Sequence, residues 1–239
     1  MITQDQLKTL SQKYQTTQLN IRREYTQHLF LSYFYQQPES NRIYFKGGTA
    51  LKILYNSPRF SEDLDFSTTH SNKTLIEKML HQAISSIEKE GVTPRIIETK
   101  TTSGGYLSRL SFDLYDQSIE VLLQISLREG KKKGELLTIV NDFIPPYTTM
   151  ALLREQMIAE KILALLSRMK PRDFYDLYFI LRANLLPAKE KKVLEKIYVM
   201  LDDVKINFDR ELRHFLPKSH WPIIRDFKSV LKRELQRYL

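Results

Sequence analysis

The feature that most constrains this chain is a glycine pair, Gly47-Gly48, followed downstream by an Asp-x-Asp pair, Asp63 and Asp65. Glycines let a backbone approach a ligand closely, and the N-terminus of a helix offers free N–H groups and a partial positive charge. Alternation along a strand points both aspartates to the same side, with their Cα atoms roughly 7 Å apart. Two such carboxylates can share divalent metal ions. The pattern therefore predicts a site for phosphate groups and their metal ions.

The order of elements around these residues is equally specific. Residues 43–45 predict a short strand, residues 49–55 a helix, and residues 64–66 a second strand. Asn56-Ser57-Pro58 separates the helix from the second strand, because proline and asparagine favour a turn. In that second strand the apolar residues on either side of Asp65 should face a core.

This strand, Gly-Gly turn, helix and Asp-x-Asp strand resemble the nucleotidyltransferase superfamily that is related to DNA polymerase beta. The fuller strings from Lys46 to Leu51 and from Arg59 to Phe66 are similar to the AbiEii/AbiGii toxin family, the toxin halves of bacterial toxin–antitoxin and abortive phage infection systems. The resemblance implies an NTP as substrate and Mg²⁺, or Mn²⁺, as the metal. Asp63 and Asp65 are then the expected metal ligands.

The resemblance also implies roles for the residues around the turn. Gly47, Gly48 and Thr49 should cradle the β- and γ-phosphates, and Thr49 can cap the helix as well. Arg59 and Ser61 lie in the loop just before the carboxylates. Arg59 is expected to contact the nucleotide, whereas Ser61 either touches a phosphate or only shapes the loop.

Members of the superfamily usually have a third carboxylate on a neighbouring strand, which bridges one metal and helps to deprotonate the attacking hydroxyl. The expected strand covers residues 118–128, and alignment by its Ile-Ser-x-Arg-Glu end puts Gln124 at that position. Glu120 is on the same side of the strand but is displaced by roughly 13 Å. Either Glu120 serves after a register shift, or the site uses two carboxylates with help from elsewhere. Asp113 is a further candidate, and Glu120 can equally be a solvent-facing strand residue.

A lysine lies on the apolar side of a helix that is expected downstream. Lys161 shares this helix face with Ile158 and Leu165, where a lysine needs either an anion or a path to water. The segment resembles the family motif Ala-Glu-Lys-x-x-Ala-Leu, which implies that Lys161 binds the triphosphate. The alternative is a surface lysine whose stem covers apolar neighbours.

The segment from Arg172 to Leu177 matches the last family motif, Arg-Asp-x-x-Asp-Leu. Asp173 and Asp176 are three residues apart and should share one helix face. One of these aspartates is expected to orient Lys161 or the nucleotide. Asp173 also falls in a first helical turn, where the helix dipole favours any carboxylate.

The distribution of glycine predicts the domain organisation of this 239-residue chain. All seven glycines lie before residue 135, and helical patterns dominate afterwards. We therefore expect an α/β nucleotidyltransferase-fold domain over residues 1–144, with a mixed sheet flanked by helices, and a helical domain over residues 145–239. Pro145-Pro146 is the expected boundary, Thr148 or Thr149 the expected cap of the next helix, and the cleft between the domains the expected active site.

Further elements follow from hydrophobic periodicity. Helices are expected over residues 6–36 and 74–90, and strands over residues 95–100, 107–115, 118–128 and 136–140.

Composition and charge indicate which class of partner and which cellular compartment suit this chain. A net charge of +9 favours a polyanion, and the resemblance implies the 3′ end of tRNA as acceptor, arrest of translation as the result, and an AbiEi-like antitoxin as partner. The chain has no cysteine, no apparent signal peptide and no apolar run long enough for a membrane span, so a cytoplasmic protein is expected.

Some residues remain open to more than one reading. Lys131-Lys132-Lys133 is either a solvated loop or a grip on RNA, and the five histidines show no metal-ligand spacing. Two other functions also stay open, namely transfer to a protein or small molecule, or a degenerate nucleotide- or RNA-binding module, which the Gln124 position favours.

Overall fold

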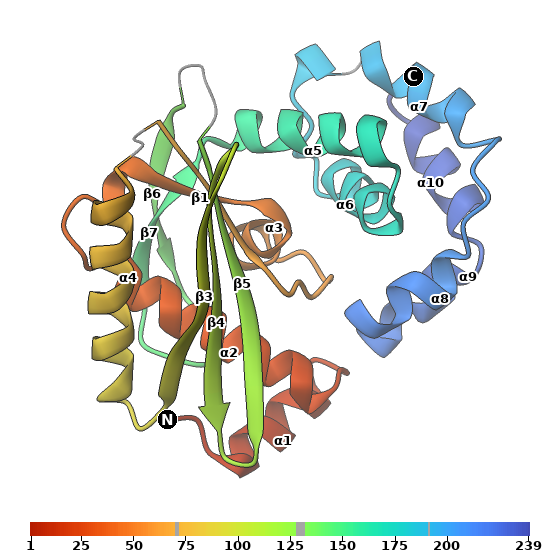
Figure 1. The fold of residues 1–239 in the computed structure, drawn as a ribbon. Coiled ribbons are helices and arrows are strands. Elements are labelled where there is room, and N and C mark those ends of the chain that lie inside the picture. Colours follow the sequence, from red (N-terminus) through yellow and green to blue (C-terminus); the bar gives the residue numbers. More distant parts are fainter. Residues whose placement is uncertain (70–71, 128–131, 191) are drawn as a thin grey trace. The chain divides into compact units, whose positions relative to one another are not determined.

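A computed structural model describes residues 1–69, 72–127, 132–190 and 192–239. The chain forms two compact units, shown in Figure 1. The sheet unit contains residues 1–56 and 60–153, and the helical unit contains residues 57–59 and 154–239. No helix in the described ranges is long and apolar enough to cross a membrane. His70 and Lys131, and the Arg-Glu end of the strand motif at residues 128–129, lie outside the described residues.

The sheet unit contains four α-helices, one short 3₁₀ helix and seven strands within its described residues. Its elements are α1 (Gln4–Lys13), α2 (Gln18–Phe34), η1 (Ser40–Arg42), β1 (Ile43–Lys46), α3 (Gly47–Tyr55), β2 (Leu64–Thr68), α4 (Lys73–Glu88), β3 (Thr93–Thr102), β4 (Gly105–Leu114), β5 (Gln117–Leu127), β6 (Gly134–Ile139) and β7 (Tyr147–Leu152). These elements confirm the strands and helices expected for residues 6–140.

The strands form one mixed sheet in the order β3-β4-β5-β2-β1-β7-β6. Neighbours pair antiparallel except β2 with β5 and β1 with β7, which are parallel. Helices α2 and α4 pack against each other and against strands of the sheet (Figure 1). The fold class expected from the sequence, a mixed sheet flanked by helices, is therefore confirmed.

The core of the sheet unit lies where α2 meets the central strands. Phe66 of β2 is fully buried, and its ring centroid lies 5.6 Å from the rings of both Phe34 on α2 and Phe45 on β1. Leu64 is also fully buried, whereas Asp65 between the two is partly exposed. The alternation expected for this strand is confirmed, and it leaves Asp65 on the face away from the core.

One prediction about the middle of the chain is wrong. Thr148 and Thr149 do not cap a helix, because residues 147–152 form strand β7, and the next helix begins only at Arg154. Thr149 is buried and Thr148 is exposed, which is the alternation of a strand. This strand lies between β1 and β6 in the sheet, so pairing with these two neighbouring strands decided its conformation.

The helical unit is built from short helices. It contains α5 (Arg154–Arg168), α6 (Pro171–Arg182), η2 (Ala188–Glu190), α7 (Lys192–Met200), α8 (Phe208–Leu212), η3 (Arg213–Phe215), η4 (Lys218–His220), α9 (Trp221–Arg225) and α10 (Phe227–Gln236). Its core includes an aromatic cluster in which Tyr175 of α6 and Phe208 of α8 lie 5.8 Å and 4.9 Å from the ring of Phe227. Pro171 stands in the first turn of α6, the position where its missing N–H costs nothing.

We expect Phe66→Ala to lower the free energy of unfolding by about 3–5 kcal/mol, because the lost ring leaves a cavity among rigid aromatic neighbours. Urea unfolding followed by circular dichroism measures this. Leu136→Ala on β6 is the control, since Leu136 is 67% exposed and should change stability by no more than about 0.5 kcal/mol. Equal losses in the two variants would contradict this account of the core.

Candidate active site

The glycine turn and the second aspartate lie directly against each other. Gly47 opens α3 with φ +87°, a conformation that favours glycine, and β1–β2 pairing puts Lys46 opposite Asp65. A Cβ atom built on Gly47 would lie 2.2 Å from Oδ2 of Asp65. Only a residue without a side chain fits between the helix N-terminus and this carboxylate. The structure therefore brings together the two parts of the sequence motif.

The remaining motif residues lie around this contact. Gly48 and Thr49 form the buried first turn of α3, and Thr49 donates its hydroxyl to the backbone carbonyl of Asp63. Asp63 comes immediately before β2, and its side chain is partly exposed, like that of Asp65. Ser61 lies in the same irregular segment. The hydrogen bond from Thr49 thus holds the segment that leads to the Asp-x-Asp pair. The expected contact of Thr49 with a phosphate stays a prediction.

Strand register places an amide beside Asp65. In the parallel pair of β2 and β5, Gln124 stands opposite Asp65. Glu120 lies four residues earlier, and its exposed side chain accepts a hydrogen bond from Arg109 at 3.1 Å. Asp113 forms an ion pair with Arg95 at 2.7 Å. Of the candidates for a third carboxylate position, only Gln124 is a direct neighbour of Asp65 across the strands.

A second cluster of charged side chains is buried inside the helical unit. Asp176 of α6 accepts hydrogen bonds from Nε and Nη2 of Arg59 at 2.7 and 3.0 Å, and from Nζ of Lys161 on α5 at 2.7 Å. Asp176 and Arg59 are 1% and 4% exposed. Burial favours a neutral Asp176, but Arg59 and Lys161 outweigh burial and hold the pKa of this carboxyl at about 2. Lys161, on the apolar face of its helix, thus contacts an anion, and that anion is Asp176, one of the two motif aspartates.

The other motif aspartate, Asp173, caps α6. Its carboxylate accepts hydrogen bonds from the Arg168 guanidinium at 2.8 and 2.6 Å and from the backbone N–H of Lys170 at 3.2 Å. Asp173 and Asp176 are both buried on α6. The contacts of Asp173 are those of a helix cap, and a direct role for it in catalysis stays a prediction. The expected cleft between the domains also stays a prediction.

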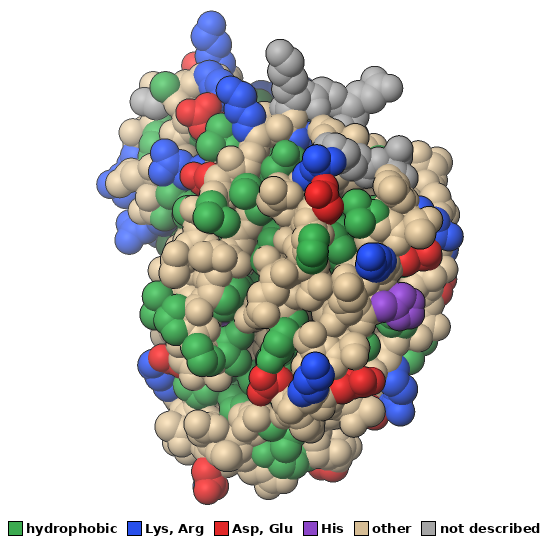
Figure 2. Space-filling model, turned by 90° about the vertical axis from the view of Figure 1, so that its left-hand side faces the viewer, with side chains coloured by type: hydrophobic (Ala, Val, Ile, Leu, Met, Phe, Trp, Pro, Cys, Tyr) green, Lys and Arg blue, Asp and Glu red, His purple; other side chains and the backbone are tan. Residues whose placement is uncertain are grey.

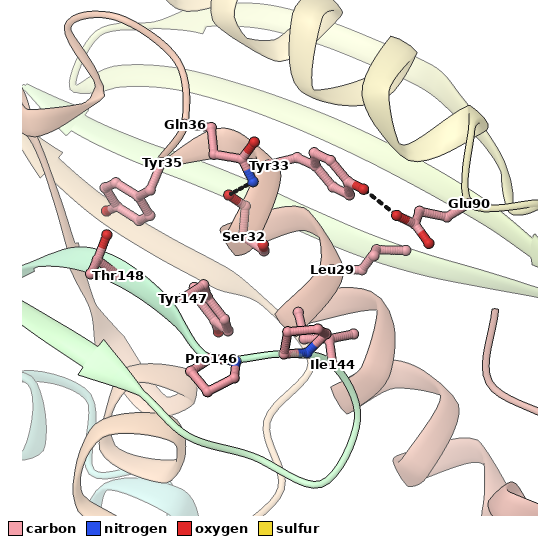
Figure 3. A pocket seen from close by; sticks show the side chains of 11 residues that line it. Leu29, Ser32, Tyr33, Tyr35, Gln36, Glu90, Ile144, Pro146, Tyr147 and Thr148 are labelled. Atoms are coloured by element: carbon pink, nitrogen blue, oxygen red, sulfur yellow. Dashed lines mark hydrogen bonds between the residues drawn. The ribbon is translucent and has the colours of Figure 1, made fainter.

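A cavity of about 500 Å³ elsewhere in the sheet unit contains none of the predicted site residues. Figure 3 shows its lining from the C-terminal half of α2, the residue Glu90 after α4, and the segment leading into β7. The hydroxyl of Tyr33 donates to Glu90, the one charged group in the described lining. An acidic cavity without a lysine or arginine does not suit a triphosphate, so the cavity is not a candidate for the nucleotide.

The residues present fit a magnesium ion that the substrate helps to bind. Among the described residues, no three or more His, Cys, Asp or Glu side chains gather into a metal-ligating group. Mg²⁺ is commonly held by one or two carboxylates together with substrate phosphates and water. Asp63 and Asp65 offer the two carboxylates, and the N-terminus of α3 adjoins Asp65 where phosphates would be needed.

Sequence patterns did not single out Gln27 of α2, although it contacts the segment before Asp63. The only local signal is a polar residue on a helix that carries many buried side chains.

Comparison with known proteins gives four findings. A family model described as "Nucleotidyl transferase AbiEii toxin, Type IV TA system" matches residues 29–235. An uncharacterized protein of Aquifex aeolicus (strain VF5), aq_aa25, is 26% identical over 204 residues, which cover 83% of this chain and 89% of that protein. The crystal structure of JHP933 from Helicobacter pylori superposes with a TM-score of 0.61 at 20% identity, covering 93% of this chain and 95% of that one. A second H. pylori structure has a TM-score of 0.59 at 19% identity, with coverage of 92% and 97%. At these identities the two structures show a shared fold.

Acid titration should reveal the buried carboxylate. The pKa of Asp176 in the folded protein, about 2, lies below its ordinary value of 3.8, so the charged form stabilises the fold above about pH 4. This contribution, about 2 kcal/mol, is lost as the pH falls through about 2. We expect the difference in unfolding free energy between the wild type and Asp176→Asn to shrink by that amount between about pH 5 and pH 2. A difference that stays constant over this range would show that Asp176 is not held as an anion.

Proposed function

This chain belongs to the AbiEii nucleotidyl transferase toxin family, and we propose that it transfers a nucleotidyl group from an NTP to the 3′-terminal hydroxyl of tRNA. The observation that carries the proposal is the contact between the Gly47 turn and Asp65. It puts a helix N-terminus, which suits phosphate, against a carboxylate, which suits a metal ion. The acceptor hydroxyl loses its proton to water, its oxygen bonds to the α-phosphorus, the bond from that phosphorus to the bridging oxygen breaks, and pyrophosphate leaves.

Each residue has a proposed task. The backbone N–H groups of Gly47 and Gly48 receive the β- and γ-phosphates at the N-terminus of α3. Asp63 and Asp65 would hold Mg²⁺ or Mn²⁺, which supplies charge relief on the phosphates and a more acidic acceptor hydroxyl when bound. Ser61 and Thr49 shape the segment that carries Asp63.

The helical unit contributes Lys161 as a further phosphate-binding group. Family resemblance assigns this lysine to the triphosphate, and its ion pair with Asp176 holds the long side chain in one orientation. Arg59 is bound to the same carboxylate, so its buried guanidinium supports Asp176. This geometry suits Arg59 as a positioning residue, with nucleotide contact as the remaining hypothesis from the resemblance.

The acceptor is proposed to be RNA because of where the charge lies. Residues 57–59 and 154–239 contain 20 Lys and Arg against 12 Asp and Glu, a net charge of +8. Residues 1–56 and 60–153 contain 17 against 16, a net charge of +1. On the side of the sheet unit that carries α4, acidic and basic side chains are interspersed (Figure 2). The helical unit thus holds nearly all of the excess positive charge that a phosphate backbone would attract.

The family belongs to a type IV toxin–antitoxin system, so an antitoxin partner is expected. We propose an AbiEi-like antitoxin, with arrest of translation and defence against phage as the outcome of modifying tRNA. A second candidate function is a module that binds nucleotide without turnover. It is favoured by Gln124, which stands where a third carboxylate would neighbour Asp65.

The direct test incubates the purified protein with each of four α-labelled NTPs, Mg²⁺ and total tRNA. We expect label on tRNA from one or more NTPs, a loss of at least about 100-fold in Asp65→Asn, and a steep fall in tRNA binding as salt rises. Asp116→Asn is the matched control, because Asp116 is an exposed carboxylate of the sheet unit, 3.9 Å from the Arg22 guanidinium, and lies outside the predicted site.

The alternatives give different results. Label on protein or on a small molecule, with salt-insensitive activity, would show that the acceptor is that molecule and not RNA. Metal-dependent nucleotide binding without transfer to any acceptor would favour the module without turnover.

Two glycine variants separate backbone strain from the contact with Asp65. Gly47→Ala should lower kcat/KM by about 100-fold, because its Cβ displaces the carboxylate of Asp65 by a distance on the order of 1 Å. Gly91→Ala is the matched control, since Gly91 also has a positive φ, +76°, but nothing lies within 4 Å of the added Cβ. Both variants carry similar backbone strain, so equal activities would show that the contact with Asp65 is irrelevant to the reaction.

A further inference from the structure

The segment that leads into the Asp-x-Asp pair has no regular secondary structure. Residues 60–63 lie outside any helix or strand, between the helical unit's segment 57–59 and the start of β2 at Leu64. Such a segment has no ladder of hydrogen bonds to set its position, so its backbone groups need other partners. Its position decides where Asp63 lies relative to Asp65.

Three consecutive carbonyls of this segment accept hydrogen bonds from two side chains. The Nε2 amide group of Gln27 donates to the carbonyl of Ser61 at 2.9 Å and to the carbonyl of Glu62 at 3.1 Å. The hydroxyl of Thr49 donates to the carbonyl of Asp63. A glutamine amide has two N–H donors, and Gln27 uses its amide group for both contacts.

The donors come from two helices that are themselves fixed in the sheet unit. Gln27 is 2% exposed on α2, the helix whose Phe34 packs on Phe66 of the core. Thr49 is 1% exposed on α3, directly after the glycine pair. Arg23, one turn before Gln27 on α2, adds an ion pair with the Glu62 carboxylate at 3.2 Å. The segment is thus attached to the same helix that packs on the back of β2.

We propose that Gln27 is a positioning residue for nucleotidyl transfer, which holds the backbone before Asp63 so that the two aspartates keep the spacing a metal ion requires. The inference rests on the proposed function of Asp63 and Asp65. Mg²⁺ demands near-ideal octahedral geometry at short distances, so a shift of the segment by a fraction of an ångström weakens binding. Side chains that orient metal ligands typically contribute about 10- to 100-fold in metal affinity or activity.

The test compares Gln27→Met with the wild type, because methionine has a similar length and no N–H donor. In the transfer assay we expect kcat/KM to fall about 10- to 100-fold and the half-saturating Mg²⁺ concentration to rise about 10-fold. A second readout is independent of turnover, namely the Mg²⁺ dependence of binding an NTP analogue with a methylene bridge between the α- and β-phosphorus, measured by calorimetry. Its half-saturating Mg²⁺ concentration should rise by the same factor.

Thr26→Val is the matched control, since Thr26 is the buried neighbour of Gln27 on α2 and donates to the Arg23 carbonyl within the helix. This variant should keep the wild-type Mg²⁺ dependence even where its thermal stability falls. If Gln27→Met does not fold, Gln27→Asn replaces it, because asparagine keeps the donors but is one methylene too short to reach both carbonyls.

The outcomes separate this inference from the proposed function. A folded Gln27 variant with the Mg²⁺ dependence and kcat/KM of Thr26→Val would overturn the positioning role. A wild-type protein that binds the analogue only with Mg²⁺, in a way that Asp65→Asn abolishes, would support the metal site even without transfer to tRNA. A wild type that shows neither metal-dependent binding nor transfer would overturn both.

Discussion

The close approach of Gly47 to Asp65 is the constraint on which the proposed site depends. Antiparallel pairing of β1 with β2 sets the register, and the carboxylate of Asp65 then occupies the space that a side chain on residue 47 would need. The positive φ of this glycine also starts α3, so one residue satisfies both requirements. Backbone hydrogen bonds between strands, rather than mobile side chains, therefore hold the turn proposed to bind phosphate against the carboxylate.

The buried cluster of Arg59, Lys161 and Asp176 positions side chains rather than a backbone turn. Removing charges from water costs free energy, and a buried ion pair often stabilises a protein no more than apolar residues of similar volume. The cluster includes a two-point Arg–Asp contact, in which the guanidinium fork is matched to the carboxylate. Such an arrangement fixes the orientation of the side chains. It leaves Lys161 with one defined position on a helix whose buried residues are otherwise apolar. The two units thus hold their motif residues in different ways. The sheet unit uses strand register, and the helical unit uses the buried carboxylate of Asp176.

Much of the fold and of the candidate site was predictable because the signals are local. The glycine pair, the alternation around Asp65 and the three-residue spacing of Asp173 and Asp176 each specify a face or a turn within a few residues. Predictions that depended on partners outside the local segment fared less well. Thr148 and Thr149 suit a helix cap as well as a strand, and pairing of β7 with β1 and β6 decided for the strand. Gln27 carried no recognisable signal, because its importance comes from carbonyls 34 and 35 residues away.

By itself, the sequence determined the order of elements as far as residue 140, the family resemblance and the residue types that chemistry on phosphates needs, since these depend on local periodicity and motif spacing. Only the tertiary structure decided which groups are neighbours. Strand register placed Gln124 beside Asp65 and left Glu120 with Arg109, and the packing of α6 against α5 and the loop at Arg59 gave Asp176 both of its cations. The physical reason is that register and burial arise from contacts between segments far apart in the chain, which local preferences do not encode.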